Sequence, residues 1–297
     1  MIGNNLETFE QLMLKAAPYM SATVTRMREG FGTDWESRFG QTLDKIFGDR
    51  EDLLELAVKG YVRFALDSIK LQMRFEKERC YVPKSYADVA SAVYHNHEYM
   101  HQLYLPGILL SHYLWSHHYR QLVWFHEHFL PLVNAAPDKS FSDIGTGTGF
   151  YSRQMLMGDP KAKGVAYDIS DHSLAYATQQ VQAFGAQDRW RAEKRDVVAS
   201  PPPPTPFILS VEVLEHLEDP LGFLRTARAV LQPGGYGFIT AAVTAPNEDH
   251  IYLYNTRAEV EDQLREAGFE VVSTLEELAY EPKADEPVPR LVACIVR

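Results

Sequence analysis

The residues best suited to chemistry begin with a glycine-rich segment that follows an apolar run ending in Asp143. The segment alternates glycine with threonine and contains Gly145, Thr146, Gly147 and Gly149. Glycine has no Cβ, so such a loop can adopt positive φ and lets a ligand contact the bare backbone. The helix expected after it adds unpaired N–H groups. We predict a cofactor-binding strand–loop–helix unit, although the spacing differs from the Gly-x-Gly-x-x-Gly of dinucleotide folds.

Acidic residues also follow the next three predicted strands, at Asp168, Asp196 and Glu212. The carboxyl ends of neighbouring parallel strands meet at one edge of a sheet, so we expect these side chains to surround one ligand. Asp168 could accept both hydroxyls of a ribose, and Asp196 could meet the amino group of an adenine. A single aspartate at a strand end is more often a helix cap. Taken together the residues favour a nucleoside site, to which the neighbouring Ile169 and Val197 also contribute.

Five motifs in this order resemble the class I S-adenosylmethionine-dependent methyltransferases, nearest the ubiquinone-biosynthesis type. They are Asp143-x-Gly-x-Gly-x-Gly, Asp168, Asp196, the segment VEVLEHLEDP at 211–220 and LQPGG at 231–235. The resemblance covers roughly residues 138–297. It implies an α/β fold with a Rossmann-like, doubly wound, seven-stranded and mostly parallel sheet whose last strand is antiparallel. It also implies S-adenosyl-L-methionine as the cofactor, with Gly145 and Gly147 beneath its methionine part.

The first 137 residues indicate a separate all-α unit. Apolar spacing predicts helices over 6–17, 34–47, 49–80 and 85–101, with one or two more over 108–132. Pro106 and Gly107 predict a break between the last two segments. We therefore expect a helical cap and substrate-binding domain over 1–137 and a cofactor-binding domain over 138–297. In the resembling family such N-terminal helices commonly form a lid.

Tyrosines are frequent in the last part of this cap, where Tyr94, Tyr104, Tyr113 and Tyr119 occur. Aromatic residues at helical spacing usually pack in a core. An aromatic face also attracts a desolvated cation such as a sulfonium by roughly 1 to 2 kcal/mol. We expect some of these tyrosines, together with His216 after the fourth strand, to contact the substrate.

Histidines are concentrated between His95 and His128, and His97 and His101 share one helical face at a spacing that can hold a metal. No cysteine or well-placed carboxylate completes a convincing set. We predict no metal site.

Groups able to take a proton follow the fifth strand, at His250 and Tyr252. This loop lies at the edge of the sheet where we expect the cofactor. A histidine near its ordinary pKa is a suitable general base. We therefore predict His250 and Tyr252 as catalytic residues.

Composition limits the partners. The net charge is −11, and neither half of the chain has an excess of lysine and arginine, which disfavours a nucleic-acid substrate. Cys80 and Cys294 lie far apart in the sequence and show no metal-ligand spacing. This pattern fits reduced thiols in a cytosolic protein. The start of the chain lacks a signal-peptide pattern and the longest apolar patch is too short to span a bilayer. We expect a cytoplasmic protein with a small-molecule substrate and no membrane partner, and a homodimer is compatible with the sequence.

Three functions remain open at this stage. The first is methyl transfer from S-adenosylmethionine to a small molecule under the helical lid, which needs alignment, exclusion of water and removal of one proton. The second is cyclisation of the cofactor itself to azetidine-2-carboxylate and methylthioadenosine, as in fold-related cyclases, which would require a tight apolar and aromatic cage. The third is a non-catalytic scaffold, against which the intact glycine loop and acidic strand ends argue.

Overall fold

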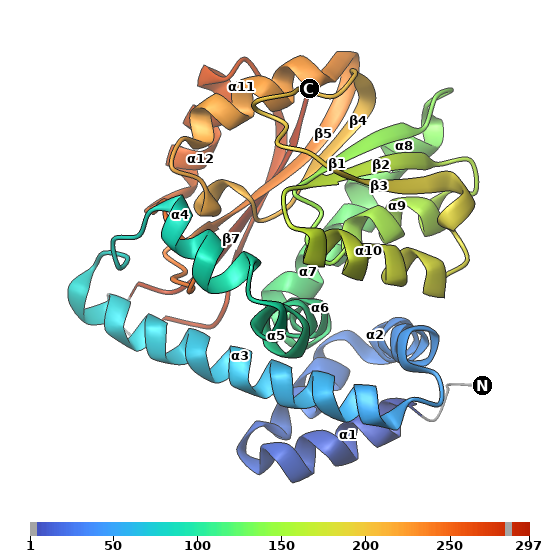
Figure 1. The fold of residues 1–297 in the computed structure, drawn as a ribbon, viewed down its shortest axis with the longest axis vertical. Coiled ribbons are helices and arrows are strands. Elements are labelled where there is room, and N and C mark those ends of the chain that lie inside the picture. The colour runs from blue at the N-terminus through green and yellow to red at the C-terminus, as the bar shows by residue number, and fades with distance from the viewer. Residues whose placement is uncertain (1–4, 283–286) are drawn as a thin grey trace.

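The computed structural model describes residues 5–282 and 287–297, which form a seven-stranded sheet flanked by helices and a helical cap at one end (Figure 1). No helix among the described residues is both long enough and apolar enough to cross a membrane.

The sheet has the order β3-β2-β1-β4-β5-β7-β6. Its strands are β1 (Ser140–Ile144), β2 (Lys163–Asp168), β3 (Trp190–Lys194), β4 (Thr205–Ser210), β5 (Leu231–Val243), β6 (Val271–Leu278) and β7 (Arg290–Val296). The first five strands pair in parallel, whereas β7 is antiparallel to both of its neighbours. The predicted doubly wound sheet with an antiparallel last strand is confirmed.

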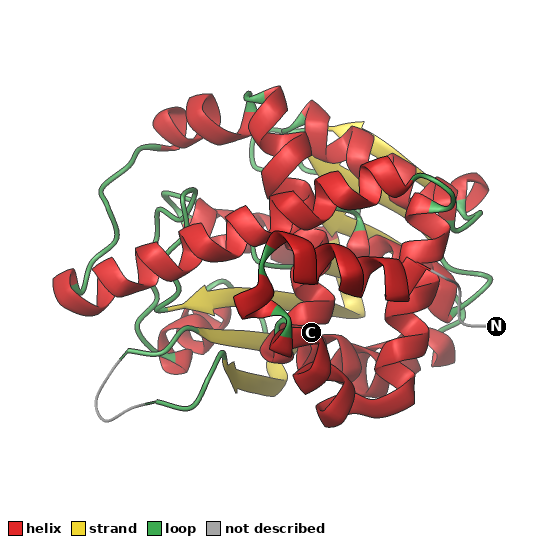
Figure 2. Cartoon of the chain, turned by 90° about the horizontal axis from the view of Figure 1, so that it is seen from below, coloured by secondary structure: helices red, strands yellow, loops and turns green. Residues whose placement is uncertain are grey.

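Alternating apolar residues give the sheet two buried faces. On β4, Phe207 and Leu209 pack in one core and Ile208 packs in the other. The second core holds apolar residues of α11 (Pro220–Val230) and α12 (Arg257–Glu266), and the first holds those of α9 (Phe150–Gly158) and α10 (Asp171–Ala183). Figure 2 shows the strands enclosed by these helices. Burial on both faces explains why the strands read as nearly continuous apolar runs.

The cap consists of helices that pack beside the first core. They are α1 (Asn5–Ala16), α2 (Ala22–Phe47), α3 (Glu51–Glu78), α4 (Tyr86–Val89), α5 (His97–Tyr99), α6 (Leu105–Leu114), α7 (Ser116–Trp124) and α8 (Leu130–Ala135). Figure 1 shows α3 running beneath the sheet domain, with α1 below it and α2 above its right-hand end, on the side of α10. One continuous core joins Trp35 and Tyr61 of the cap to Phe141 and Phe238 of the sheet. The cap is therefore packed onto the sheet domain across the expected boundary at 137/138.

The structure corrects several helix boundaries. The expected helix over 34–47 is the second half of α2, which starts at Ala22 and bends at Gly32, where φ is 64°. The expected helix over 85–101 is interrupted at His95 and Asn96, and the Asn96 side chain caps α5. The five-residue segments 90–94, 100–104 and 125–129 are π-helical, a form that sequence periodicity does not reveal.

The predicted break at Pro106 and Gly107 is wrong. Pro106 occupies the second position of α6, where a missing N–H is tolerated. Gly107 is required for packing, because a Cβ there would lie 2.5 Å from Cγ of Phe64 on α3. The chain instead breaks at Trp115, whose backbone is extended between α6 and α7.

Candidate cofactor and acceptor site

The glycine loop follows β1 and adopts the predicted positive φ at each glycine, 74° at Gly145, 52° at Gly147 and 74° at Gly149. The Oδ2 atom of Asp143 holds this loop in place. It accepts hydrogen bonds from the Thr146 hydroxyl and from the Ser152 hydroxyl of α9, both at 2.7 Å. Burial raises the pKa of Asp143 to about 6. Asp143 therefore clamps the loop to the tip of β1.

The three glycines differ in what surrounds them. A Cβ on Gly145 would lie 2.6 Å from Val213 Cγ2, and one on Gly149 would lie 2.7 Å from Ala177 Cβ. A Cβ on Gly147 would meet nothing within 4 Å. Gly145 and Gly149 therefore allow close packing within the protein. Gly147 faces open space that a ligand can fill.

Asp168 ends β2 directly beside this open glycine. Its Oδ2 accepts a hydrogen bond from Gly147 N–H at 3.1 Å, and its Oδ1 accepts one from Ser170 N–H at 2.9 Å. Burial raises the pKa of Asp168, while these two backbone N–H groups oppose the shift. Asp168 and Ile169 both line the cavity described below, as the sequence predicts.

Asp196 has a different position. It is exposed after β3, and its Oδ1 accepts hydrogen bonds from Val198 N–H at 2.9 Å and Ala199 N–H at 3.2 Å. Val197 is buried in the second core. Neither residue is among those that line the cavity. Their contribution to a nucleoside site stays a prediction, since the bonds of Asp196 are those of a turn cap.

Glu212 follows β4 and has an unusual backbone for a residue other than glycine, with φ of 53°. Its N–H donates to Thr240 Oγ1 at 2.9 Å, and the Thr240 hydroxyl donates to Glu212 Oε1 at 2.8 Å. Burial raises the pKa of Glu212. Such a backbone costs roughly 1 to 3 kcal/mol and is typical of functional sites.

One cavity of about 960 Å³ joins these groups to the cap. Residues of the sheet domain that line it include Gly145, Thr146, Gly147, Asp168, Ile169, Glu212, Glu215, His216 and His250. Residues of the cap that line it include Met20, Met27, Phe31, Tyr61, Phe64, Ile69, Met73, Tyr86, Tyr94, Tyr104 and Trp115. The acidic strand ends and the apolar cap thus face the same space.

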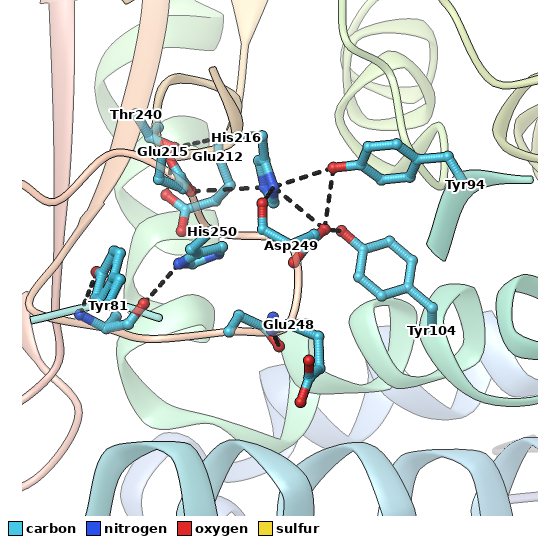
Figure 3. A network of polar contacts seen from close by, with 12 residues as sticks. Tyr81, Tyr94, Tyr104, Glu212, Glu215, His216, Thr240, Glu248, Asp249 and His250 are labelled. Carbon is cyan, nitrogen blue, oxygen red and sulfur yellow. Dashed lines mark hydrogen bonds and ion pairs between the residues drawn. The ribbon is translucent and has the colours of Figure 1, made fainter. Parts of the chain in front are cut away.

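A buried polar network crosses from the sheet domain to the cap (Figure 3). Its centre is Asp249, which is 0% exposed. Asp249 Oδ2 accepts hydrogen bonds from the hydroxyls of Tyr104 and, at 3.2 Å, Tyr94, and it lies 3.2 Å from His216 Nδ1. Burial alone would lower the pKa of His216, but Asp249 raises it to about 10. His216 and Asp249 therefore form a buried ion pair.

His250 lies beside this pair, with its ring 4.8 Å from that of His216. Its Nδ1 donates to the backbone oxygen of Ala245 at 2.6 Å, which leaves the lone pair on Nε2. Burial and the neighbouring His216 lower the pKa of His250 to about 3. His250 is therefore neutral, with one nitrogen free to accept a proton or a hydrogen bond.

Glu215 completes the cluster and is fully buried, with no hydrogen-bond partner for either carboxylate oxygen. Burial and the nearby Glu212 raise the pKa of Glu215 well above its usual range. One ligand atom each from Glu215, His216 and His250 lies within 4.8 Å of the others. Carboxylate and imidazole are ligands of divalent ions, so these residues could hold one. The sequence predicted no metal site, and its histidine spacing drew attention to His97 and His101 instead.

Comparisons with known proteins identify a methyltransferase domain in this part of the chain. A family model described as a methyltransferase domain matches residues 142–236. The ubiquinone biosynthesis O-methyltransferase of Parvibaculum lavamentivorans is 33% identical over 108 residues, which cover 36% of this chain and 42% of that protein. The ubiquinone biosynthesis O-methyltransferase of Burkholderia pseudomallei is 26% identical over 185 residues, which cover 53% of this chain and 78% of that protein. A solved structure described as PigF with SAH has a TM-score of 0.50 at 15% identity, covering 84% of this chain and 76% of that chain.

The chain contains a methyltransferase domain of the class I S-adenosylmethionine-dependent type over residues 142–236. The match spans less than half of the length of the Parvibaculum protein, so it identifies the cofactor domain and not the acceptor. S-adenosylmethionine is the cofactor of methyltransferases of this type. The open space above Gly147 fits the methionine part of the cofactor, which needs a bare backbone, and the carboxylate of Asp168 fits the ribose, which needs an acceptor for its hydroxyls.

Besides Gly149, Asp196 and Val197, three further predicted site residues do not line the cavity. Tyr113 is buried in the cap, where its hydroxyl contacts Thr42 Oγ1 at 2.7 Å. Tyr119 is buried against Phe31, with ring centroids 4.7 Å apart. Tyr252 packs beside α12, where its hydroxyl accepts a hydrogen bond from Gln263 at 3.4 Å. Their helical or loop spacing resembled that of the lining residues, but packing turns them away.

Sequence reasoning missed three residues that the fold brings to the site: Tyr86, Glu215 and Asp249. Burial raises the pKa of Tyr86, and Asp168 and Asp196 raise it further, so this cap tyrosine lies near both acidic strand ends. Glu215 has the sequence context of a solvated helix start, yet its side chain is fully buried. Asp249 precedes the predicted His250 in the loop after β5. The concentration of proton-accepting residues in that loop could have indicated Asp249 as well. Its two tyrosine partners could not be found from spacing.

Proposed function

We propose that the protein transfers a methyl group from S-adenosylmethionine to a small, largely apolar molecule bound beneath the cap. The observation that supports this is the single cavity of about 960 Å³, which extends from Gly147 and Asp168 to the cap helices. Sites for drug-sized ligands occupy roughly 300 to 1,000 Å³. A cavity at the upper end of that range has room for a cofactor and a second small molecule.

The cap side of the cavity supports an apolar acceptor. Met27, Tyr61 and Phe64 are buried side chains in its wall. At its rim, Ile69 and Met73 on α3 are 53% and 55% exposed. Exposed apolar residues that border a cavity often mark a ligand entrance, because the ligand covers them on binding.

The residues at the sheet end of the cavity are suited to orienting the acceptor and accepting its proton. When bound, S-adenosylmethionine supplies an electrophilic methyl group, so the protein has to orient the acceptor, exclude water and accept one proton. The free Nε2 of neutral His250 is available as that proton acceptor. Its low pKa makes it a weak base, so orientation would contribute more than proton transfer.

Cyclisation of the cofactor is the less favoured alternative. A four-membered ring is strained, and its formation would need a close-fitting cage around one molecule. A cavity of about 960 Å³ is much larger than such a cage.

Incubation of the protein with S-adenosylmethionine alone, and with a panel of apolar phenols and amines, tests the proposal. Mass spectrometry should detect S-adenosylhomocysteine and a methylated product only when an acceptor is present. Methylthioadenosine formed without any acceptor would instead support cyclisation. Neither product with any acceptor, despite measurable cofactor binding, would support a scaffold.

A further inference from the structure

We propose that Asp249 is a positioning residue that locks the cap segment 81–104 over the cofactor and orients His216 in the same step. The proposal rests on the cofactor site but not on the identity of the acceptor. It predicts that binding and release of the cofactor require the contacts of Asp249 to open.

The first support is the set of hydrogen-bond donors around this one carboxylate. Tyr94 and Tyr104 come from the cap and His216 comes from the loop after β4, and all three contact Asp249 Oδ2. His216 Nδ1 also lies 3.1 Å from the backbone oxygen of Asp249 and 3.2 Å from the Tyr94 hydroxyl. Figure 3 shows the two tyrosines pointing toward Asp249 from the cap side, with His216 above it.

The second support is the way in which the cap places the two tyrosines. Tyr94 and Tyr104 are the last residues of the π-helical segments 90–94 and 100–104. A π-helical turn holds an extra residue and shifts the following side chains, and such turns are frequent at functional sites. The second segment is seated on α3 at Gly60, where a Cβ would lie 2.2 Å from the Gln102 carbonyl oxygen. This close approach fixes Tyr104 relative to the long helix.

The third support is that the same cap segment contacts the same loops elsewhere. Ala245 N–H donates to the Tyr81 hydroxyl at 3.1 Å, and Tyr86 N–H donates to Glu218 Oε1 at 2.7 Å. Lys84 Nζ lies 3.3 Å from Glu248 Oε2. The contacts of Glu218 and Glu248 are exposed, so water can replace them with little loss, whereas Tyr81 is buried and holds the start of the segment. The buried carboxylate of Asp249 has to keep its donors or become hydrated.

The cap segment 81–104 lies next to the cofactor site, so its contacts with Asp249 can control access to that site. Tyr86, Tyr94 and Tyr104 line the cavity that also contains Gly147 and Asp168. A nucleoside bound at Asp168 would therefore lie beneath residues 86–104. Opening the contacts of Asp249 would release the cofactor and free His216 together.

Stopped-flow measurement of S-adenosylhomocysteine release tests the proposal. The Tyr94→Phe/Tyr104→Phe variant keeps both rings and removes both hydroxyls, and we expect its dissociation rate to rise at least tenfold, as expected for the loss of one or two hydrogen bonds to a charged group. Tyr99→Phe is the matched control. Tyr99 lies in the same part of the cap, where its ring stacks on that of Tyr104, and it does not line the cavity. It should leave the rate within twofold.

Limited trypsin digestion of the ligand-free protein gives an independent measurement, since Arg79 and Lys84 flank the start of the segment. Cleavage there should be several-fold faster in Tyr94→Phe/Tyr104→Phe and in Asp249→Asn than in the natural protein or in Tyr99→Phe. Equal cleavage and equal release rates would overturn the proposal. If the natural protein failed to bind S-adenosylhomocysteine but the variants were still cleaved faster, the lock would stand and the proposed function would fail.

Discussion

Replacement of Asp168 by alanine should separate cofactor binding from folding. In the ligand-free protein the carboxylate accepts two backbone hydrogen bonds, from Gly147 at 3.1 Å and from Ser170 at 2.9 Å. Hydrogen bonds to a charged group contribute about 1.5 to 3 kcal/mol each, and the lower end applies to a half-buried group. After replacement, water can reach the two N–H groups. Two bonds at that lower end contribute about 3 kcal/mol, and hydration of the two N–H groups returns part of it, so we expect the free energy of unfolding to fall by roughly 2 kcal/mol, which leaves the domain folded.

The loss of cofactor binding free energy in Asp168→Ala should be larger than its loss of folding stability. A carboxylate that accepts both ribose hydroxyls contributes about 3 kcal/mol or more to binding, which corresponds to a factor of roughly 150 in Kd. Asp168→Asn keeps one oxygen acceptor and should weaken binding by roughly tenfold. Asp171→Asn is the matched control, because Asp171 lies three residues away with its side chain 70% exposed in an ion pair with Lys194.

Calorimetric titration with S-adenosylhomocysteine measures the binding, and urea unfolding without ligand measures the stability. Asp196→Ala belongs in the same series and should weaken binding less than Asp168→Ala, since Asp196 is exposed and does not line the cavity. The reasoning would be refuted if Asp168→Ala bound within threefold of the natural protein, or if Asp196→Ala were the more damaging change.

Four further predictions follow from the site. Gly147→Ala should cost about 1 to 2 kcal/mol of stability for its positive φ, whereas Gly145→Ala should cost more because its Cβ also meets Val213; urea unfolding compares them. Burial raises the pKa of Glu215 in the fold, so ionisation of this carboxyl lowers the free energy of unfolding as pH rises above its unfolded-state pKa. In the presence of a chelator, Glu215→Gln should therefore be more stable than the natural protein at pH 8 and equally stable near pH 4, as urea unfolding at both pH values measures. His250→Asn should lower kcat for an identified acceptor and leave the affinity for S-adenosylhomocysteine within threefold; unchanged kcat would remove His250 from catalysis. Ile69→Glu should raise KM for an apolar acceptor at nearly unchanged melting temperature, and an unchanged KM would place the entrance elsewhere.

The sequence alone determined the cofactor half of the site. Glycine at alternating positions reports a local backbone requirement, and all three loop glycines have positive φ. The position of Asp168 beside that loop also followed from sequence, because parallel strands in a doubly wound sheet end at the same edge. Both inferences depend on short stretches of chain and on one topological rule.

Only the tertiary structure decided which cap residues reach the cavity. Tyr94 and Tyr104 line it while Tyr113 and Tyr119 are buried away from it, although all four lie in helical sequence. The π-helical turns shift the register of the first pair, and the extended residue Trp115 redirects the chain before Tyr119. Neither feature has a distinctive residue pattern.

The meeting of Tyr104 with Asp249 joins residues 145 positions apart, and the ion pair of His216 with Asp249 joins two separate loops. Burial at such contacts also sets the charges, since it makes His250 neutral while its neighbour His216 stays protonated. A residue's type fixes the chemistry it can perform, and local sequence fixes the strand end or loop on which it lies. The protonation state of the residue depends on which distant groups are buried beside it, and only the packed tertiary structure decides that.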